Sequence, residues 1–359
     1  MMRTAVGIVG AGTICRGFAW AGLCALCAWS TACDDDSKEE TDRHASSSDN
    51  DDKDKPDAAP SDAAQTAQSL RVTITVPSVP PGTEGTQCLK TRLGNSGAIK
   101  VNKVHNRLFG ETHHFVVSTV TDPNATEEGL YECPPFRAPL TGAPLTITQK
   151  HDEVVTLPEG VGYALEENQL MHLELHYINN SDTEMDVSAE AELFLSTNDQ
   201  DIQEAGFLIV GNLAIKIPPR SMHSTGEVYM PVPAQLDGVH YYAFTGHTHW
   251  LGTNVSVDIV PSEDGEATPI YHLPNFDWTA PEVVYKDPPV QVPAGGGFRF
   301  SCDWYNPTDD TIGYGESART EMCFFWAYYY PKHPTQLSLL ASKEKSIYAD
   351  AGTDAPKKP

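Results

Sequence analysis

The chain has 359 residues, with 49 acidic against 24 basic side chains and a formal net charge of −25. This acidity argues against nucleic acid as a partner, because phosphate binding depends on basic side chains. The length allows two ordinary domains, and after the first 33 residues we find no stretch long and apolar enough to span a membrane.

The first 33 residues have the pattern of an export signal. A basic leader precedes an apolar stretch over 17–28, which is too short for a bilayer span but suits a cleaved signal. Small residues then lead into Cys33, which resembles a bacterial lipobox, although Ser30 stands where leucine is usual. We expect a lipoprotein-type signal peptide over 1–33, with Cys33 lipidated. The alternative is an ordinary signal peptide cut nearby.

Residues 34–68 are predicted to be an acidic, disordered tether. Between 34 and 62 the chain has twelve Asp/Glu against four Lys/Arg, so it buries too little apolar surface to offset its chain entropy. The protein is therefore expected to be exported and lipid-anchored to a bacterial membrane, facing the periplasm or the cell exterior. The anchor would be its only contact with the membrane.

From residue 69 onward the apolar residues repeat with a period of two, which is typical of half-buried β-strands. The 27 prolines and 27 glycines fit many turns and few helices. In chain order, we expect strands at 70–76, 113–121, 171–178, 187–195, 207–217, 239–244, 254–260, 298–305 and 322–330.

The strand pattern predicts an all-β fold of two tandem antiparallel β-sandwiches, jelly-roll-like. The polar run 196–201 is the natural boundary. We expect an N-terminal domain over 69–198, a C-terminal domain over 199–335, and a polar tail over 336–359 that is frayed from residue 342 onward.

Four cysteines remain in the mature chain besides Cys33. An even number in an exported chain predicts two disulfides. Three pairings are possible, and pairing within each half is the most economical, since two cysteines lie early and two late. A zinc site is the alternative, although no C-x-x-C spacing supports it. The four are Cys88, Cys133, Cys302 and Cys323.

Histidines occur at spacings that suit metal ligands. His247 and His249 are two apart, so an extended segment turns both imidazoles to one face. His113 and His114 are adjacent, so they reach one metal ion together only at a bulge or a strand end. Either His172 or His176, which also share a face, would complete a three-histidine site with the adjacent pair.

Met322 is the candidate third ligand beside His247 and His249, with a core-filling role as the alternative. Two imidazoles and a thioether favour copper, above all Cu(I), over zinc, calcium or magnesium. The sequence thus predicts two unequal copper sites. An all-nitrogen site can relay electrons, and a softer site with an open position can react with O2.

Four motifs, in this order, resemble the copper type II ascorbate-dependent monooxygenases, the family of peptidylglycine α-hydroxylating monooxygenase and dopamine β-monooxygenase. The resemblance covers residues 70–335. The motifs are Thr112-His113-His114-Phe115; Gly160-Val161-Gly162-Tyr163 followed by Leu173-Glu174-Leu175-His176-Tyr177; Gly246-His247-Thr248-His249-Trp250-Leu251-Gly252; and Glu321-Met322-Cys323 with Tyr329-Tyr330-Pro331 behind it.

The resemblance implies the ligands, because a histidine-tyrosine pair marks the third ligand of the family's electron-transfer copper. That points to His176 rather than His172. It implies two coppers per chain, separated by a gap between the domains, and disulfides Cys88–Cys133 and Cys302–Cys323. The electron-transfer copper would be held by His113, His114 and His176, and the catalytic copper by His247, His249 and Met322.

The resemblance also implies the reaction: with ascorbate or another one-electron reductant, one atom of O2 is inserted into an activated C–H bond of a small or peptide-like substrate. Thr245 stands where peptide-hydroxylating members have a carboxylate-binding arginine, and Phe324 and Trp326 replace polar residues. A less polar or aromatic substrate is therefore expected. The alternatives are a non-catalytic periplasmic copper-binding lipoprotein (a buffer or carrier) and a structural β-sandwich with incidental histidines.

Overall fold

The computed structural model describes most of the chain after residue 67, all of it within the compact unit 64–359. The predicted signal peptide, Cys33 and the tether up to residue 67 lie outside the described residues. In the part that is described, no helix has the length and apolar character needed to cross a membrane. The described ranges are 68–122, 124–138, 142–196, 202–334, 337–341 and 346–350.

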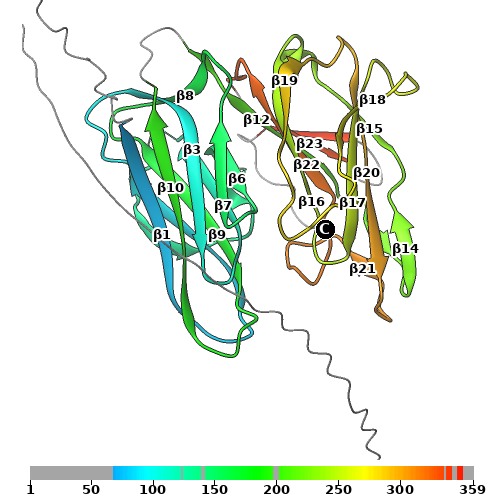
Figure 1. Ribbon diagram of the computed structural model, residues 1–359, viewed down its shortest axis with the longest axis horizontal. Helices are drawn as coiled ribbons and strands as arrows, with labels where there is room; N and C mark the ends of the chain where they lie inside the picture. Colours follow the sequence, from blue (N-terminus) through cyan, green and yellow to red (C-terminus); the bar gives the residue numbers. More distant parts are fainter. Residues whose placement is uncertain are drawn as a thin grey trace, which may run out of the picture. The chain divides into compact units, whose positions relative to one another are not determined.

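Two sheets are built almost entirely from the first half of the chain (Figure 1). Sheet I contains, in spatial order, β1 (Ser69–Val79), β10 (Met185–Leu195), β3 (Ile99–Phe109), β8 (Val161–Leu165) and β11 (Gln203–Glu204), with β7 (Asp152–Thr156) also paired to β3. Sheet II contains β5 (Gly129–Glu132), β2 (Glu84–Arg92), β9 (Leu170–Ile178), β4 (Thr112–Val120) and β6 (Gly142–Thr148).

Two further sheets and a short ribbon are built from the second half. Sheet III contains β19 (Val284–Val290), β16 (His240–His247), β22 (Phe324–Tyr330), β12 (Gly206–Asn212), β23 (Leu337–Ala341) and β24 (Ser346–Asp350). Sheet IV contains β14 (Ser221–Ser224), β20 (Gly297–Asn306), β17 (Gly252–Val260) and β18 (Thr268–His272), with β15 (Val228–Pro231) paired to β20; β13 (Lys216–Ile217) pairs with β21 (Ile312–Gly313).

The alternation in the sequence determines which side chains form the core. In β1, Val72, Ile74 and Val76 are buried between exposed neighbours, as a strand with one wet face requires. They share a hydrophobic cluster with Phe115 of β4 and Leu173 of β9 in sheet II. The all-β prediction is confirmed. The division into two domains stays a prediction, because its boundary falls in 197–201, outside the described residues.

Strand β9 differs from β1 because it is buried on both faces. Leu173 and Leu175 face the core shared with sheet I, while His172, Glu174 and His176 occupy the opposite face and are also buried. Buried polar side chains need partners. This second face of β9 therefore needs partners outside the first core, and it forms the floor of the site described below.

The predicted polar tail needs a correction, because part of it forms strands. Strand β23 pairs in parallel with β12, and β24 pairs with β23. Leu339 is 1% exposed and belongs to the second hydrophobic cluster, so β23 is stabilised by burial. Residues 351–359 lie outside the described part of the chain.

Candidate metal centre

His113 and His114 stand at a β-bulge at the start of β4. The register of β4 against β9 shifts between Thr112 and His114, and His114 then lies opposite His176. The extra residue of a bulge lets adjacent side chains turn to the same side. The ring centroids of His113 and His114 lie 5.5 Å apart, and that of His176 lies 5.4 Å and 4.9 Å from them. The irregularity that joint ligation requires is present.

The three imidazoles are arranged as metal ligands. One ring nitrogen from each of His113, His114 and His176 lies within 4.8 Å of the others. Burial lowers the pKa of His113 to about 3 and that of His114 well below its usual range. Both rings are therefore neutral at physiological pH, as ligation requires.

Unpartnered nitrogens show that a metal ion fits this set. Nε2 of His113, both ring nitrogens of His114 and Nδ1 of His176 are buried without a hydrogen-bond partner in the described ranges. Such orphaned atoms are rare in native proteins and call for an explanation. Three imidazoles that converge on one point would be satisfied by a metal ion such as copper.

Glu84 orients His176, and nothing in the sequence pattern singled it out. Its Oε1 lies 3.2 Å from His176 Nε2. This hydrogen bond is the main reason that the pKa of Glu84 falls to about 2. The contact assigns the ring proton to Nε2 and leaves Nδ1 as the free nitrogen. The same carboxylate accepts hydrogen bonds from Ser317 Oγ (3.1 Å) and the backbone N–H of Ala318 (2.7 Å).

Glu174 fixes the loop that covers His114. Its carboxylate accepts the backbone N–H groups of Phe136 (2.5 Å) and Ala138 (2.8 Å), and burial raises its pKa to about 7. The disulfide between Cys88 and Cys133 ties the same loop to β2. Phe136 therefore stacks on His114, with ring centroids 4.9 Å apart. This predicted disulfide is confirmed.

His247 is the last residue of β16, and His249 follows two residues later, beyond the strand. Their ring centroids lie 5.3 Å apart. Nδ1 of His247 lies 2.6 Å from Oε1 of Gln149, and Nδ1 of His249 lies 2.9 Å from the Thr320 carbonyl oxygen. Each Nδ1–H therefore donates to an oxygen, which leaves both Nε2 atoms for a metal ion.

The electrostatics of His247 and His249 match those of the first set. Burial lowers the pKa of His247 well below its usual range and that of His249 to about 4. Nε2 of His247 is buried and has no hydrogen-bond partner among the residues with described coordinates. Both rings are thus neutral donors, like those of His113 and His114.

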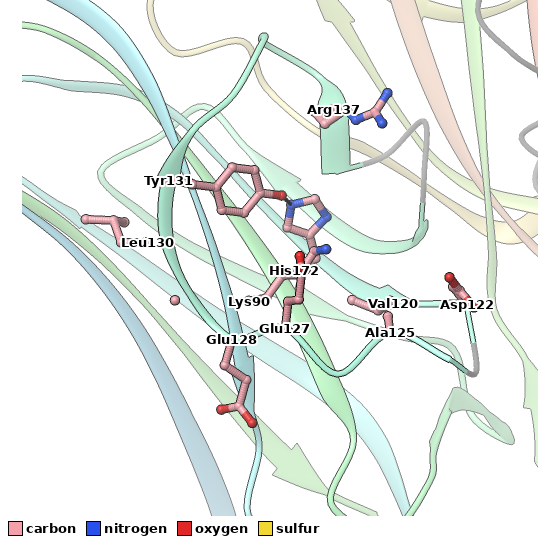
Figure 2. Close-up of a pocket in the computed structure, with 11 residues that line it drawn as sticks. Lys90, Val120, Asp122, Ala125, Glu127, Glu128, Leu130, Tyr131, Arg137 and His172 are labelled. Carbon is pink, nitrogen blue, oxygen red and sulfur yellow. Dashed lines mark hydrogen bonds between the residues drawn. The ribbon is translucent and has the colours of Figure 1, made fainter.

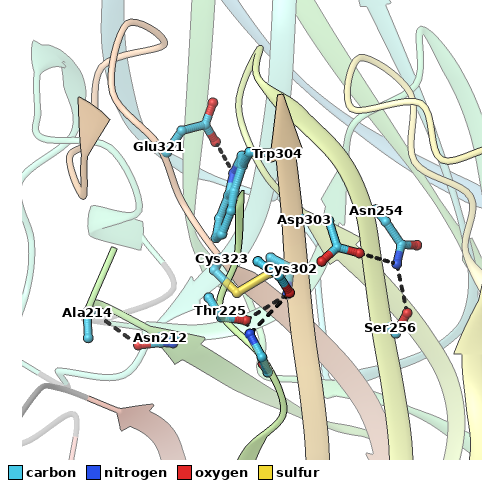
Figure 3. The surroundings of a disulfide bond; sticks show 12 residues. Asn212, Ala214, Thr225, Asn254, Ser256, Cys302, Asp303, Trp304, Glu321 and Cys323 are labelled. Atoms are coloured by element: carbon cyan, nitrogen blue, oxygen red, sulfur yellow. Dashed lines mark hydrogen bonds between the residues drawn. A yellow bond between two sulfur atoms is a disulfide. The ribbon is translucent and has the colours of Figure 1, made fainter. Parts of the chain in front are cut away.

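Met322 is 2% exposed. It lies just before β22, whereas the predicted strand over 322–330 included it. Glu321 holds one side of it, because its carboxylate accepts the backbone N–H groups of His249 and Leu251 at 2.9 and 2.8 Å. The same carboxylate accepts Trp304 Nε1–H at 2.9 Å (Figure 3). On the other side, Cys323 forms the second predicted disulfide, with Cys302.

The two histidine sets form one continuous cluster. The ring centroid of His247 lies 6.3 Å from that of His113 and 6.2 Å from that of His114. The expected gap between two separate sites is therefore not seen in this structure. The rings of Phe136 and Trp326 lie 5.5 and 5.3 Å from that of His247, so aromatic side chains cover the point where the sets meet.

His172 lies outside this cluster. Its Nε2 is 2.8 Å from the hydroxyl oxygen of Tyr131, and it does not belong to the group of converging nitrogens. The structure thus brings together His113, His114, His176, His247 and His249, and ties the segment just before Met322 to His249 through Glu321.

The fold and the site define an all-β protein with a buried, converging set of imidazoles. Residues 203–351 match the model of the copper type II ascorbate-dependent monooxygenase C-terminal domain. This match to the second half of the chain supports the copper type II ascorbate-dependent monooxygenase family. The matched region contains His247, His249 and Met322.

Other comparisons add no functional information. No curated protein matches the chain. Among solved structures, it is similar to the major capsid protein P2 of bacteriophage PM2 (TM-score 0.31, 9% identity, 73% of this chain and 97% of that one). It is also similar to the cowpea mosaic virus top component, a naturally occurring empty particle (TM-score 0.30, 9% identity, 73% and 88%). We draw nothing from scores this low.

Proposed function

We propose that this protein is a copper-dependent monooxygenase that inserts one atom of O2 into an activated C–H bond, using ascorbate or another one-electron reductant. The observation that carries the proposal is the cluster of five buried histidines, three of which have converging ring nitrogens, in a chain whose second half matches this family. Copper, when bound, supplies the redox chemistry with O2.

The chain's own residues would hold two coppers. Three nitrogen donors, from His113, His114 and His176, suit an electron-transfer site. The imidazoles of His247 and His249 with the thioether of Met322 suit a catalytic site, because a soft ligand favours Cu(I).

The supporting residues hold these ligands in place. Glu84, Gln149 and the Thr320 carbonyl accept ring N–H groups and so fix the tautomers. Phe136 and Trp326 lie against the imidazoles and keep water away from them.

An apolar pocket beside Met322 supports a weakly polar substrate. Its volume is about 320 Å³, and its lining includes Ile209, Phe324, Trp326 and Leu340. Apolar pockets with few polar groups bind apolar or aromatic molecules. We propose an apolar or aromatic substrate bound here. Hydroxylation assays on a panel of aromatic amines and glycine-extended peptides test this, and turnover of peptides alone would contradict it.

Export and lipid anchoring through Cys33 are part of the proposal, with membrane contact through the lipid alone and no nucleic acid partner. Two disulfides support an oxidising compartment. Labelling the expressing cells with a fatty-acid analogue should mark the wild-type chain and not a Cys33→Ala variant. Equal labelling of both would overturn the anchor.

Copper per chain is the first test of the function. The copper-loaded wild type should bind two ions, and Met322→Leu, which keeps the side-chain volume but removes the sulfur, should retain one firmly under reducing conditions. The wild type should also consume O2 only when reductant is present. Two coppers without O2 consumption would point to the carrier, and one copper or none would overturn the two-site proposal.

A further inference from the structure

A second pocket, with a volume of about 650 Å³, lies in the first half of the chain and is separate from the apolar one. At its centre is His172, which is 3% exposed. Figure 2 shows the His172 ring among the lining residues, with its hydrogen bond to Tyr131. The two rings are stacked, with centroids 6.1 Å apart. The metal centre uses neither the buried His172 nor its exposed partner Tyr131.

The pocket and the metal centre share one face of sheet II. His172, Glu174 and His176 alternate along β9, so their side chains point the same way. His172 lies opposite Lys90 of β2, whereas His176 lies opposite His114 of β4. The two histidines are four positions apart along the strand, which is roughly 13 Å. A molecule in this pocket would therefore sit on the same central strand as the three-histidine set.

The lining of this pocket has charges of both signs, which limits the chemical classes of ligand that could bind there. Lys90 and Arg137 lie close enough to His172 that their positive charges, added to the larger effect of burial, lower its pKa to about 4. Lys90 Nζ also lies 5.9 Å from the centroid of the Tyr131 ring. The carboxylates of Asp122, Glu127 and Glu128 line the same pocket, and that of Glu128 forms an ion pair with Arg92 at 3.6 Å.

These groups suit a small, polar, singly charged molecule. Lysine and arginine attract an anionic edge, and carboxylates accept hydrogen bonds from hydroxyl groups. A simple anion would be repelled by the carboxylates, and a cation by Lys90 and Arg137. An anion that also carries several hydroxyl groups matches both sides of the pocket.

We propose that this pocket binds the reductant of the enzyme, a small enediol monoanion of the ascorbate type. The anionic enediol edge would face Lys90 and Arg137, and the hydroxyl groups would donate to Asp122 and Glu127. The inference rests on the proposed function, which requires a one-electron donor, and it places that donor on β9 beside the electron-transfer ligands.

Calorimetric titration of ascorbate into the metal-free full chain, without oxygen, tests the pocket apart from turnover. Saturable one-to-one binding is expected, with dehydroascorbate, which lacks the enediol, at least about tenfold weaker. Lys90→Gln should weaken ascorbate binding at least about fivefold. Lys216→Gln, a change at an exposed lysine on β13, is the matched control and should leave it unchanged.

The Glu127→Gln variant distinguishes a specific hydrogen bond to ascorbate from attraction by net charge alone. If ascorbate were held only by net charge, removing a carboxylate would strengthen its binding; a hydroxyl-carboxylate contact predicts weaker binding instead. No saturable binding, equal effects of Lys90→Gln and Lys216→Gln, or stronger binding by Glu127→Gln would each overturn the pocket assignment.

Measuring bound copper distinguishes a wrong pocket assignment from a wrong monooxygenase proposal. Lys90→Gln should keep two coppers and be reduced by dithionite as the wild type is, while its KM for ascorbate rises. If the wild type binds ascorbate in this pocket but holds no copper, the monooxygenase proposal falls and an enediol-binding site remains.

Discussion

Gln149 holds His247 and the residue before it: its Oε1 lies 2.6 Å from His247 Nδ1, and its Nε2 donates to the Gly246 carbonyl oxygen at 3.2 Å. Gln149 directly follows β6, in the first half of the chain, whereas His247 ends β16 in the second. A residue from one half thus sets the tautomer of a candidate ligand in the other.

Replacing Gln149 with methionine should weaken copper binding at the site of His247, His249 and Met322 by about 10- to 100-fold, because groups that orient a metal-bound histidine typically contribute this much. Competition with a chelator measures the affinity. Gln291→Met, at a glutamine that bonds to the Gly238 carbonyl instead, is the control. Equal affinities in the two variants would show that the Gln149 contact does not position His247.

Glu84 should determine which nitrogen of His176 carries the proton. In the metal-free protein, nitrogen NMR of labelled histidine is expected to show His176 protonated at Nε2, because Glu84 accepts that proton. Glu84→Ala should remove this preference, whereas Glu84→Gln should retain most of it, since the amide oxygen still accepts. A wild-type ring protonated at Nδ1 would contradict the assignment.

Removing the disulfide between Cys302 and Cys323 by a double alanine substitution should lower the free energy of unfolding by about 3 kcal/mol, as expected for a loop of this length, since the cysteines are 21 positions apart. Urea unfolding measures the loss. Because Cys323 follows Met322, the variant should also lose copper from the methionine site under reducing conditions.

The matched control for that experiment is the double alanine variant of Cys88 and Cys133. Its free energy of unfolding should fall by at least as much, because the loop closed by this disulfide is longer. It should nevertheless retain copper at the methionine site. Equal copper retention by both variants would show that the Cys302–Cys323 bond does not hold Met322.

Glu153 should make stability depend on pH. Burial raises its pKa from 4.5 to about 7. Between these values the folded chain keeps a proton that the unfolded chain has lost, so this residue's contribution lowers stability as pH rises from about 4.5 to about 7 and is constant above. Glu153→Gln removes the dependence, so the variant's advantage over wild type should be greater at pH 8 than at pH 4.5 by on the order of 2 to 3 kcal/mol.

Thermal or urea unfolding of Glu153→Gln and wild type at both pH values checks this. Glu263→Gln, at an exposed glutamate in the second half, is the control and should give no comparable pH-dependent difference. If Glu153→Gln behaves as this control does, Glu153 is ionised in the folded protein well below pH 7.

The period of two and the paired histidines made much of this protein predictable from its sequence. All nine expected strands are present, although 207–217 proves to be two strands, β12 and β13. Alternating positions such as Val72 and Ile74 specify a face directly. For the same reason, adjacent histidines that bind one metal ion from a strand require a bulge or a strand end, and the register shift at His114 supplies the bulge.

The partners of the ligands were not predictable, because they come from distant parts of the chain. Gln149 is 98 residues from His247, and Glu84 is 92 residues from His176. Neither interrupts a pattern, since single polar residues are common at strand ends. The strand β23 was missed because its five residues are stabilised by pairing with β12 rather than by alternation of their own.

The bulge before His114 affects the metal ligands of β4 but not the core packing of that strand. Beyond the bulge, Phe115 and Val117 lie opposite Leu175 and Leu173 and are fully buried, so the ladder continues as it would without the extra residue. A related chain one residue shorter at this point could keep every core contact of β4 while losing one imidazole from the centre. In such a lineage the metal chemistry could disappear through a single-codon deletion and leave behind a stable β-sheet protein.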